Sequence, residues 1–115
     1  MRRGDHRKFG REKNQRNALY KALATALIEH GKIKTTIAKS KSLSSFMDKL
    51  VTTARSGDIA SRRLLAKDIG EKAVHKLTNE ISPKFKDRQG GYTRVIRLGQ
   101  RKSDGAPMAL IEFTS

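Results

Sequence analysis

Apolar residues between positions 17 and 30 recur every three or four residues, the spacing that keeps side chains on one face of an α-helix. They are Leu19, Ala22, Leu23, Ala26 and Leu27. Gly31 follows them, and glycine is typical of the position just beyond a helix. The pattern therefore predicts a helix that ends at Gly31.

Residues 32–37 follow a different pattern, in which polar and apolar side chains alternate and β-branched residues are frequent. This pattern is typical of a strand, with Ile33, Thr35 and Ile37 on one face. Lys32 and Lys34 are then expected to point away from the core.

Helical spacing returns at about residue 38 and continues, with breaks, as far as Pro83. Gly57 and Gly70 are expected to end helices, Asp58 to cap the helix after Gly57, and Pro83 to close the helical half. The apolar stripes are Leu43, Phe46, Met47, Leu50, Val51 and Ala54 in the second helix, Ile59, Leu64 and Leu65 in the third, and Ala73, Val74, Leu77 and Ile81 in the fourth.

Residues 92–98 and 108–114 are predicted to be strands, joined by a turn-rich segment too long for a tight hairpin. The order helix, strand, three helices, two strands predicts an α/β fold with two layers, like α+β folds: a small mixed sheet covered by helices on one face. Its expected buried residues are Ile33, Val95 or Ile96, Ile111 and Phe113. The other face is left open.

Residues 1–16 differ in composition from the rest of the chain, with seven Lys or Arg and one large apolar residue, Phe9. Such a segment cannot bury a core of its own. We therefore predict a basic arm, 1–16, followed by a single compact domain, 17–115.

The charge of the whole chain is strongly positive, with 26 Lys and Arg against 11 Asp and Glu, a formal net charge of +15. Phosphate groups would neutralise this charge and release counterions, so a nucleic acid is the expected partner. An anionic membrane is second, because no apolar run approaches the roughly 18 residues that a spanning helix needs.

Three basic patches are the candidate contacts for phosphate. The arm contributes Arg2, Arg3, His6, Arg7, Lys8, Arg11, Lys13 and Arg16. The segment after Pro83 contributes Lys84, Lys86, Arg88, Arg94, Arg97, Arg101 and Lys102. The first strand and the start of the second helix contribute Lys32, Lys34, Lys39 and Lys41. Arginine matches phosphate geometry and a helix N-terminus attracts anions, although charged runs can also be merely solvated.

Gly90, Gly91 and Tyr92 lie within the second patch and allow two interpretations. Paired glycines permit a close approach of backbone N–H groups to phosphate, and Tyr92 could stack on a base or ribose. Alternatively, the glycines form an ordinary turn into a strand, with Tyr92 packed at the sheet edge. Spacing alone does not separate the two.

Catalytic chemistry is not predicted. There is no Cys, and His6, His30 and His75 are not spaced as metal ligands. The acidic residues alternate with Lys and Arg, and no nucleophile elbow, Walker loop or zinc-protease motif occurs. We therefore expect no cofactor, no metal and no small-molecule substrate. The basic N-terminus is not followed by the apolar segment of a signal peptide, which favours a cytoplasmic protein.

Several segments together resemble the bacterial large-subunit ribosomal proteins of the L-seventeen family. They are Asp87-Arg88-Gln89-Gly90-Gly91-Tyr92-Thr93-Arg94-Val95-Ile96-Arg97-Leu98, Asp104-Gly105-Ala106-Pro107-Met108-Ala109-Leu110-Ile111-Glu112, Ile28-Glu29-His30, Ile33-Lys34-Thr35-Thr36, and His6-Arg7-Lys8 with Arg16. Their order and separation also fit, so the resemblance covers nearly the whole chain.

The resemblance implies a structural, non-catalytic constituent of the large ribosomal subunit that binds and stabilises its ribosomal RNA during translation. It also implies neighbouring ribosomal proteins near the exit of the peptide tunnel. Two other classes compete: a nucleic-acid-binding regulator that works outside the ribosome, and a nuclease or RNA-modifying enzyme. A regulator would leave the large-subunit fraction of a lysate, and an enzyme would depend on a single His or carboxylate.

Overall fold

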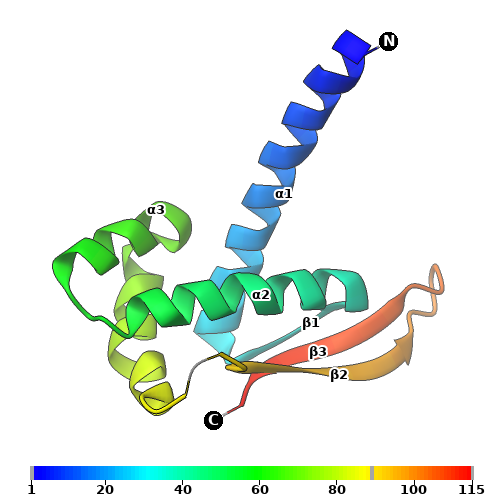
Figure 1. Ribbon diagram of the computed structural model, residues 1–115. Coiled ribbons are helices and arrows are strands. Elements are labelled where there is room, and N and C mark those ends of the chain that lie inside the picture. Colours follow the sequence, from blue (N-terminus) through cyan, green and yellow to red (C-terminus); the bar gives the residue numbers. More distant parts are fainter. Residues whose placement is uncertain (1, 89, 115) are drawn as a thin grey trace.

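The first helix, α1 (Arg2–His30), is the longest element, and its N-terminal half projects away from the rest of the molecule (Figure 1). The structure, a computed structural model, describes residues 2–88 and 90–114, with the backbone alone for residues 2–12. Among residues 13–30, whose side chains the structure describes, Ala24, Leu27 and Ile28 are the buried ones of α1. Gly31, at φ +82°, ends it and donates its N–H to Leu27 O at 2.7 Å, as the sequence predicts.

The second helix, α2 (Ile37–Ala54), lies along one face of the sheet and contacts every strand (Figure 1). Thr36 caps its start, because its hydroxyl accepts a hydrogen bond from Lys39 N at 3.3 Å. The predicted apolar stripe is buried with the exception of Phe46, which is partly exposed. Ser40 is buried in addition, with its hydroxyl bonded to Ile37 O at 2.7 Å.

The third helix, α3 (Ile59–Lys76), begins at the predicted cap: the Asp58 carboxylate accepts a hydrogen bond from Ser61 N at 2.7 Å. Gly70 has φ +80° and ψ 163°, so the predicted break is confirmed as a sharp kink between two helical segments. Leu65 is buried, whereas the side chains of Ile59 and Leu64 are 70% and 57% exposed. The apolar stripe predicted for this helix is therefore only partly a core stripe.

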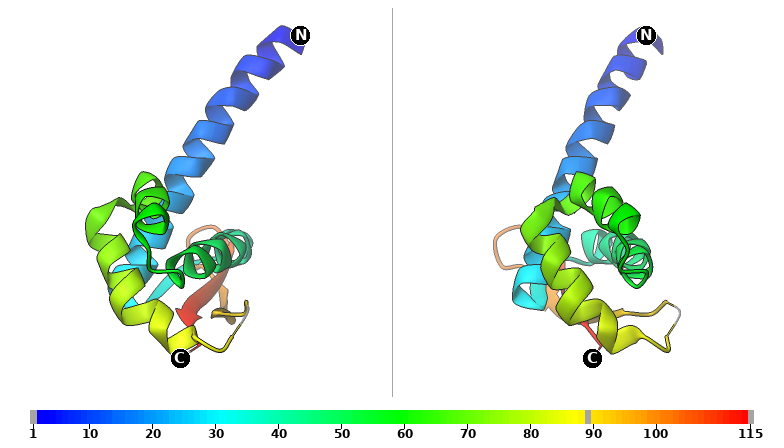
Figure 2. Two further views of the ribbon diagram at one scale, coloured as in Figure 1. Left: turned by 60° about the vertical axis from the view of Figure 1, so that its left-hand side comes forward. Right: turned by 90° about the vertical axis from the view of Figure 1, so that its left-hand side faces the viewer.

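Two short turns follow α3 and carry the chain back toward the sheet. They are the π-helical turn η1 (Leu77–Ile81) and the 3₁₀ turn η2 (Ser82–Phe85), in which Pro83 occupies the first turn. Pro83 closes the helical half as predicted. Figure 2 shows the segment after η2 extending from one end of the molecule before it enters the sheet.

The sheet consists, in the described part of the chain, of β1 (Lys32–Thr36), β2 (Thr93–Gln100) and β3 (Pro107–Phe113), in the order β1-β3-β2. Both pairings are antiparallel, so the expectation of a mixed sheet is wrong. β1 and β2 run in the same direction, but β3 separates them because the hairpin from β2 inserts its second strand beside β1. A β-bulge between Arg97 and Gly99 interrupts the pairing of β2 with β3.

The core lies between the sheet and the helices, which confirms the expected two-layer α+β arrangement (Figure 2). Ile111 is completely buried, while Ile33, Val95 and Phe113 pack against the core in part. Ile96 faces the other side and is 40% exposed, so Val95 is the core residue of the pair. Within the described residues, no helix is both long enough and apolar enough to cross a membrane.

Candidate nucleic-acid interface

The basic arm corresponds to the projecting half of α1. Lys13 and Arg16 lie there with exposed side chains. Six more predicted contacts have side chains outside those that the structure describes: Arg2, Arg3, His6, Arg7, Lys8 and Arg11. The α1 backbone continues without interruption past position 16, so the arm shares a helix with the domain.

The open face of the sheet brings together cations that are far apart in the sequence. Lys32 and Arg94 both lie opposite Glu112 in the strand register, and Lys34 is two residues along β1 on the same face. Arg94 Nε lies 3.0 Å from Glu112 Oε1, so one carboxylate sits in a row between two cations. Exposed Ile96 lies on this face too, opposite Leu110, so the face carries apolar side chains beside the cations.

Other predicted contacts, from two of the patches, lie on the side of the sheet that α2 covers. Arg97 lies opposite Ala109, which is buried, so it is on the helix-covered face of the sheet. Exposed Lys39 and Lys41 lie on the first turns of α2. The patches predicted from the sequence are therefore divided between the two faces of the sheet.

The loop between β2 and β3 holds an internal ion pair. Arg101 donates from Nε and Nη2 to the two carboxylate oxygens of Asp104, at 2.9 and 2.7 Å. These hydrogen bonds, with one from Ala106 N, lower the pKa of Asp104 to about 2. The neighbouring Lys102 is exposed, and together with Lys34 it lines a hollow of about 400 Å³ beside the loop.

Gly90 and Gly91 both have positive φ, at +87° and +65°, as the sequence suggests for a turn. Arg88 supports this turn: its Nη1 donates to Gly91 O at 3.3 Å and to Thr114 Oγ1 at 2.6 Å. Its guanidinium also lies 5.9 Å from the centre of the Phe85 ring. Arg88 thus ties the turn to the end of β3.

Tyr92 is completely buried, so its ring cannot stack on a base, and the second interpretation of this residue is the correct one. The ring packs edge-on against Phe85, with 5.1 Å between centroids. Its hydroxyl donates to Arg88 O at 3.1 Å and accepts from Arg55 Nη1 at 3.2 Å. A residue that can fill the core and still satisfy a hydroxyl is better placed here than at an interface.

Arg55 was not identified from the sequence, yet it organises this region. It lies just after α2 and donates to Lys86 O and Arg88 O, both at 2.7 Å. A lone arginine on a helix end has no sequence signal that distinguishes it from a solvated cation, because its partners are backbone carbonyls about thirty residues away.

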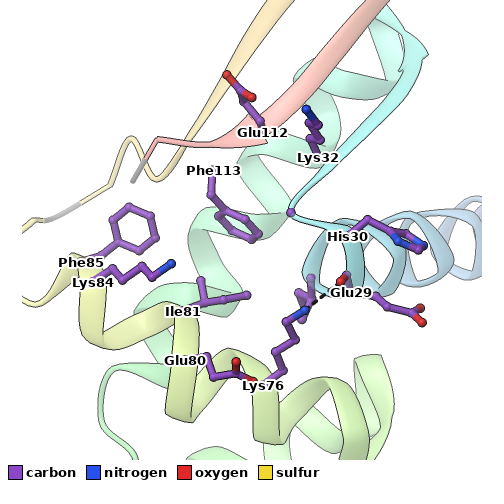
Figure 3. A pocket seen from close by; sticks show the side chains of 12 residues that line it. Glu29, His30, Lys32, Lys76, Glu80, Ile81, Lys84, Phe85, Glu112 and Phe113 are labelled. Atoms are coloured by element: carbon purple, nitrogen blue, oxygen red, sulfur yellow. Dashed lines mark hydrogen bonds between the residues drawn. The ribbon is translucent and has the colours of Figure 1, made fainter.

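A separate hollow of about 380 Å³ lies where α1 ends beside β1, β3 and the η1–η2 turns (Figure 3). Lys76 reaches across it and donates to Glu29 O, at the end of α1, at 2.7 Å. His30, Lys84, Glu80 and Glu112 add charges of both signs to the lining. Among the described residues, no three His, Asp or Glu side chains are grouped so that they could hold a metal ion.

Comparison of the sequence with known proteins places the chain in a family. The family described as Ribosomal protein L17 matches residues 19–114, which is most of the chain. The chain belongs to the ribosomal protein L17 family. The resemblance noted in the sequence is thus confirmed.

Curated relatives of this L17-family chain match it over nearly its full length. "Large ribosomal subunit protein bL17" of Thermus thermophilus is 48% identical over 109 residues, covering 93% of this chain and 92% of the relative. The bL17 proteins of Thermoanaerobacter and Campylobacter jejuni are 46% and 47% identical, covering 94% and 96% of this chain and 97% and 95% of the relatives. These matches extend into the arm, because residues 17–115 alone are a smaller share of the chain.

The segments that identify the L17 family serve the fold in this structure. Gly90 and Gly91 make the turn, Tyr92 fills the core, and Ala109 is buried opposite Thr35 on the helix-covered face. The segments that carry the resemblance therefore contain residues that shape the fold. The exposed cations project from the elements that these residues hold in place.

Proposed function

We propose that this chain is a structural constituent of the large ribosomal subunit, where it binds and stabilises large-subunit ribosomal RNA and catalyses no reaction. The observation that carries the proposal is its 48% identity, over 93% of its length, to a protein named as part of that subunit. The net charge of +15 supports an RNA partner, because phosphates neutralise cations and release counterions.

The RNA contacts that we propose come from two directions. The arm supplies one set, which is Arg2, Arg3, His6, Arg7, Lys8, Arg11, Lys13 and Arg16. The domain supplies Lys32, Lys34, Lys39, Lys41, Arg94, Arg97 and Lys102, all exposed. Contacts of this kind position a protein on phosphates and read RNA shape more than sequence.

Two arginines, Arg88 and Arg101, and the two glycines Gly90 and Gly91 have a supporting part in this proposal. Arg88 holds the Gly90–Gly91 turn and Arg101 holds its loop through Asp104, so both act first by fixing the backbone beside the RNA. The turn itself offers backbone N–H groups that could approach a phosphate. Tyr92 has no RNA contact in this proposal, because it is buried.

The place of the chain follows from the same proposal. As a large-subunit constituent it belongs in the cytoplasm, within the ribosome. We further propose that neighbouring ribosomal proteins near the exit of the peptide tunnel are its protein contacts, as the family resemblance implies.

A sucrose gradient of cell lysate tests the proposal directly. The protein is followed by immunoblot in magnesium buffer, at moderate and then at high salt. Co-migration with the large subunit at both salt concentrations is expected. Release at moderate salt, or migration with bulk nucleic acid, would instead favour a regulator that works outside the ribosome.

A further inference from the structure

A hollow of about 460 Å³ lies between the end of α2 and the η1–η2 turns, where Lys86 of the second basic patch meets Arg55, which no patch includes. Its lining contains two cations, Arg55 and Lys86, and hydroxyl groups from each wall: Thr52, Ser56, Thr78 and Ser82. None of the described residues that line it is acidic. We call it the Arg55 hollow.

The guanidinium of Arg55 is held in a fixed position with part of its donor capacity unused. Nη1 donates to Arg88 O and Tyr92 Oη, and Nη2 donates to Lys86 O. An arginine side chain has five N–H donors, so Nε–H and one N–H of Nη2 are left. Among the described residues, Arg55 has no carboxylate within 4.0 Å, so its charge is balanced only by neutral oxygens and the end of the α2 dipole.

Lys86 gives the hollow a second cation whose ammonium group is exposed. Within the part of the chain that the structure describes, its Nζ makes neither an ion pair nor a hydrogen bond. Its backbone carbonyl accepts from Arg55, which fixes Lys86 beside the guanidinium. Two adjacent cations without a carboxylate would repel each other unless an anion joined them.

The hydroxyls that a ligand in the hollow can reach are those of Thr52 and Ser56, whose side chains are exposed. Thr78 and Ser82 lie deeper: both are buried, and Ser82 Oγ donates to Thr78 O at 3.0 Å. The hollow therefore presents two cations and two exposed hydroxyl-bearing side chains to solvent.

We propose that the Arg55 hollow binds one phosphate of the RNA backbone together with its adjoining ribose. Lys86 Nζ and the unused donors of Arg55 contact the phosphate oxygens, and the exposed hydroxyls of Thr52 and Ser56 face the ribose. Cations and hydroxyls side by side are what a sugar-phosphate unit requires, since the 2′-hydroxyl both donates and accepts hydrogen bonds. The proposal rests on the proposed function, because it assigns a further contact for the same RNA.

The test compares two exposed lysines. Lys86→Met removes the cation of the Arg55 hollow, whereas Lys67→Met removes an exposed cation of α3 that belongs to none of the three basic patches. The full chain is titrated onto transcribed large-subunit ribosomal RNA at several salt concentrations. We expect K86M to weaken binding about tenfold and to reduce the log–log salt slope by about one, and K67M to do neither.

A third variant, Ser56→Ala, tests the ribose contact without changing charge. Because Ser56 is exposed and its hydroxyl makes no hydrogen bond among the described residues, S56A should unfold at nearly the same denaturant concentration as the wild type. It should nevertheless bind the RNA several-fold more weakly. Wild-type affinity in S56A would overturn the ribose contact.

The remaining outcomes separate this site from the proposed function. Equal effects of K86M and K67M, with tight binding by the wild type, would overturn the Arg55 hollow alone. A wild-type chain that did not bind the RNA would overturn both proposals. Inorganic phosphate distinguishes the sources of the anion: if it alone bound at Lys86 at submillimolar concentration, followed by amide chemical shifts, the hollow would be a free-phosphate site and the RNA assignment would be wrong.

Discussion

The hydroxyl of Tyr92 joins three segments that are distant in the sequence: it bonds Arg88 O and Arg55 Nη1, and lies 3.3 Å from Thr52 Oγ1. Tyr92→Phe keeps the ring in the core and removes these bonds. Since Arg55 Nη1 and Arg88 O still bond to each other, only the bonds of the tyrosine hydroxyl are lost, and we expect the free energy of unfolding to fall by about 0.5–1.5 kcal/mol. Urea denaturation followed by circular dichroism measures it.

Tyr20→Phe is the matched control for that change. Tyr20 is partly exposed, its ring centroid is 6.5 Å from that of Phe46, and its hydroxyl makes no hydrogen bond within the described residues. Removing this hydroxyl should alter the free energy of unfolding by less than about 0.5 kcal/mol. Equal effects at the two tyrosines would mean that the Tyr92 network contributes nothing to stability.

The Arg101–Asp104 pair makes a prediction about pH. The hydrogen bonds from Arg101 lower the pKa of Asp104 from 3.8 to about 2, so the carboxylate is more acidic in the folded chain than in the unfolded one. Its stabilising contribution is therefore present above pH 3.8 and is lost as the pH falls through about 2. A titration of the carboxyl carbon by NMR should give the low pKa in the wild type.

Two neighbouring substitutions show which contact is responsible. Arg101→Gln removes the guanidinium and should raise the pKa of Asp104 toward 3.8. Lys102→Gln removes the next cation, which makes no hydrogen bond to Asp104 within the described loop, and should leave it at about 2. A pKa that moved equally in both variants would indicate a general charge effect instead of the direct bonds.

At this scale the sequence indicates the kind of residue but not its partner. Gly90 and Gly91 were expected to have positive φ, because a turn was needed there, and they do. The burial of Tyr92 depends on where Phe85 packs, and that contact is made only in the folded chain. The same holds for Arg55, whose acceptors are carbonyls brought near by tertiary structure.

The kink of α3 depends on one glycine. Gly70, at φ +80° and ψ 163°, lies in a backbone region that other residues rarely adopt, although an added Cβ would meet no atom within 4 Å. Gly70→Ala should therefore lower the free energy of unfolding by about 1–3 kcal/mol through backbone strain alone. Thermal and urea denaturation both measure the change.

Lys67→Ala provides the comparison within the same helix. Lys67 is exposed, so its replacement should change stability by less than about 0.5 kcal/mol. If Gly70→Ala were as stable as Lys67→Ala, the kink would be a soft feature that the helix can straighten without cost.

Elements with local signals were predicted well, and elements defined by partners were not. Gly31 and Asp58 each carry their own end signal, and the helix boundaries at both are confirmed. The strand direction depends on which neighbour β3 joins, so the sheet was wrongly expected to be mixed. Ile59 has the spacing of a core residue, but it is the first residue of α3 and its side chain is 70% exposed.

Across the whole molecule, positive charge is spread over a narrow body and a projecting helix. The body holds its fold through a core of aliphatic and aromatic side chains, to which residues 13–16 of α1 contribute nothing buried. The positive charge of the arm is thus separate from the described core. It follows that this charge can be removed while the core residues are kept.

Deleting residues 1–16 tests that separation. In the described part of α1, residues 13–19 are exposed and the first buried residue is Ala24, so the shortened chain should fold and unfold at nearly the same temperature as the full chain. The deletion removes seven Lys or Arg and two acids, so RNA affinity should fall. The dependence of affinity on salt should also flatten, by about 0.7–0.9 in log–log slope for each phosphate that the arm no longer neutralises. Filter binding to large-subunit ribosomal RNA across a range of salt concentrations measures both quantities.

The control for the deletion removes charge from another surface of the same chain. Arg62, Arg63 and Lys67 are exposed on α3, and changing all three to Gln lowers the net charge by three, against five for the deletion. Long-range attraction depends on total charge and is screened within about 10 Å at 0.1 M salt, whereas a bound phosphate must lie at the side chain itself. The slope should therefore change far less per charge in the α3 variant than in the deletion, and an unchanged slope after deletion of residues 1–16 would mean that the arm does not bind RNA.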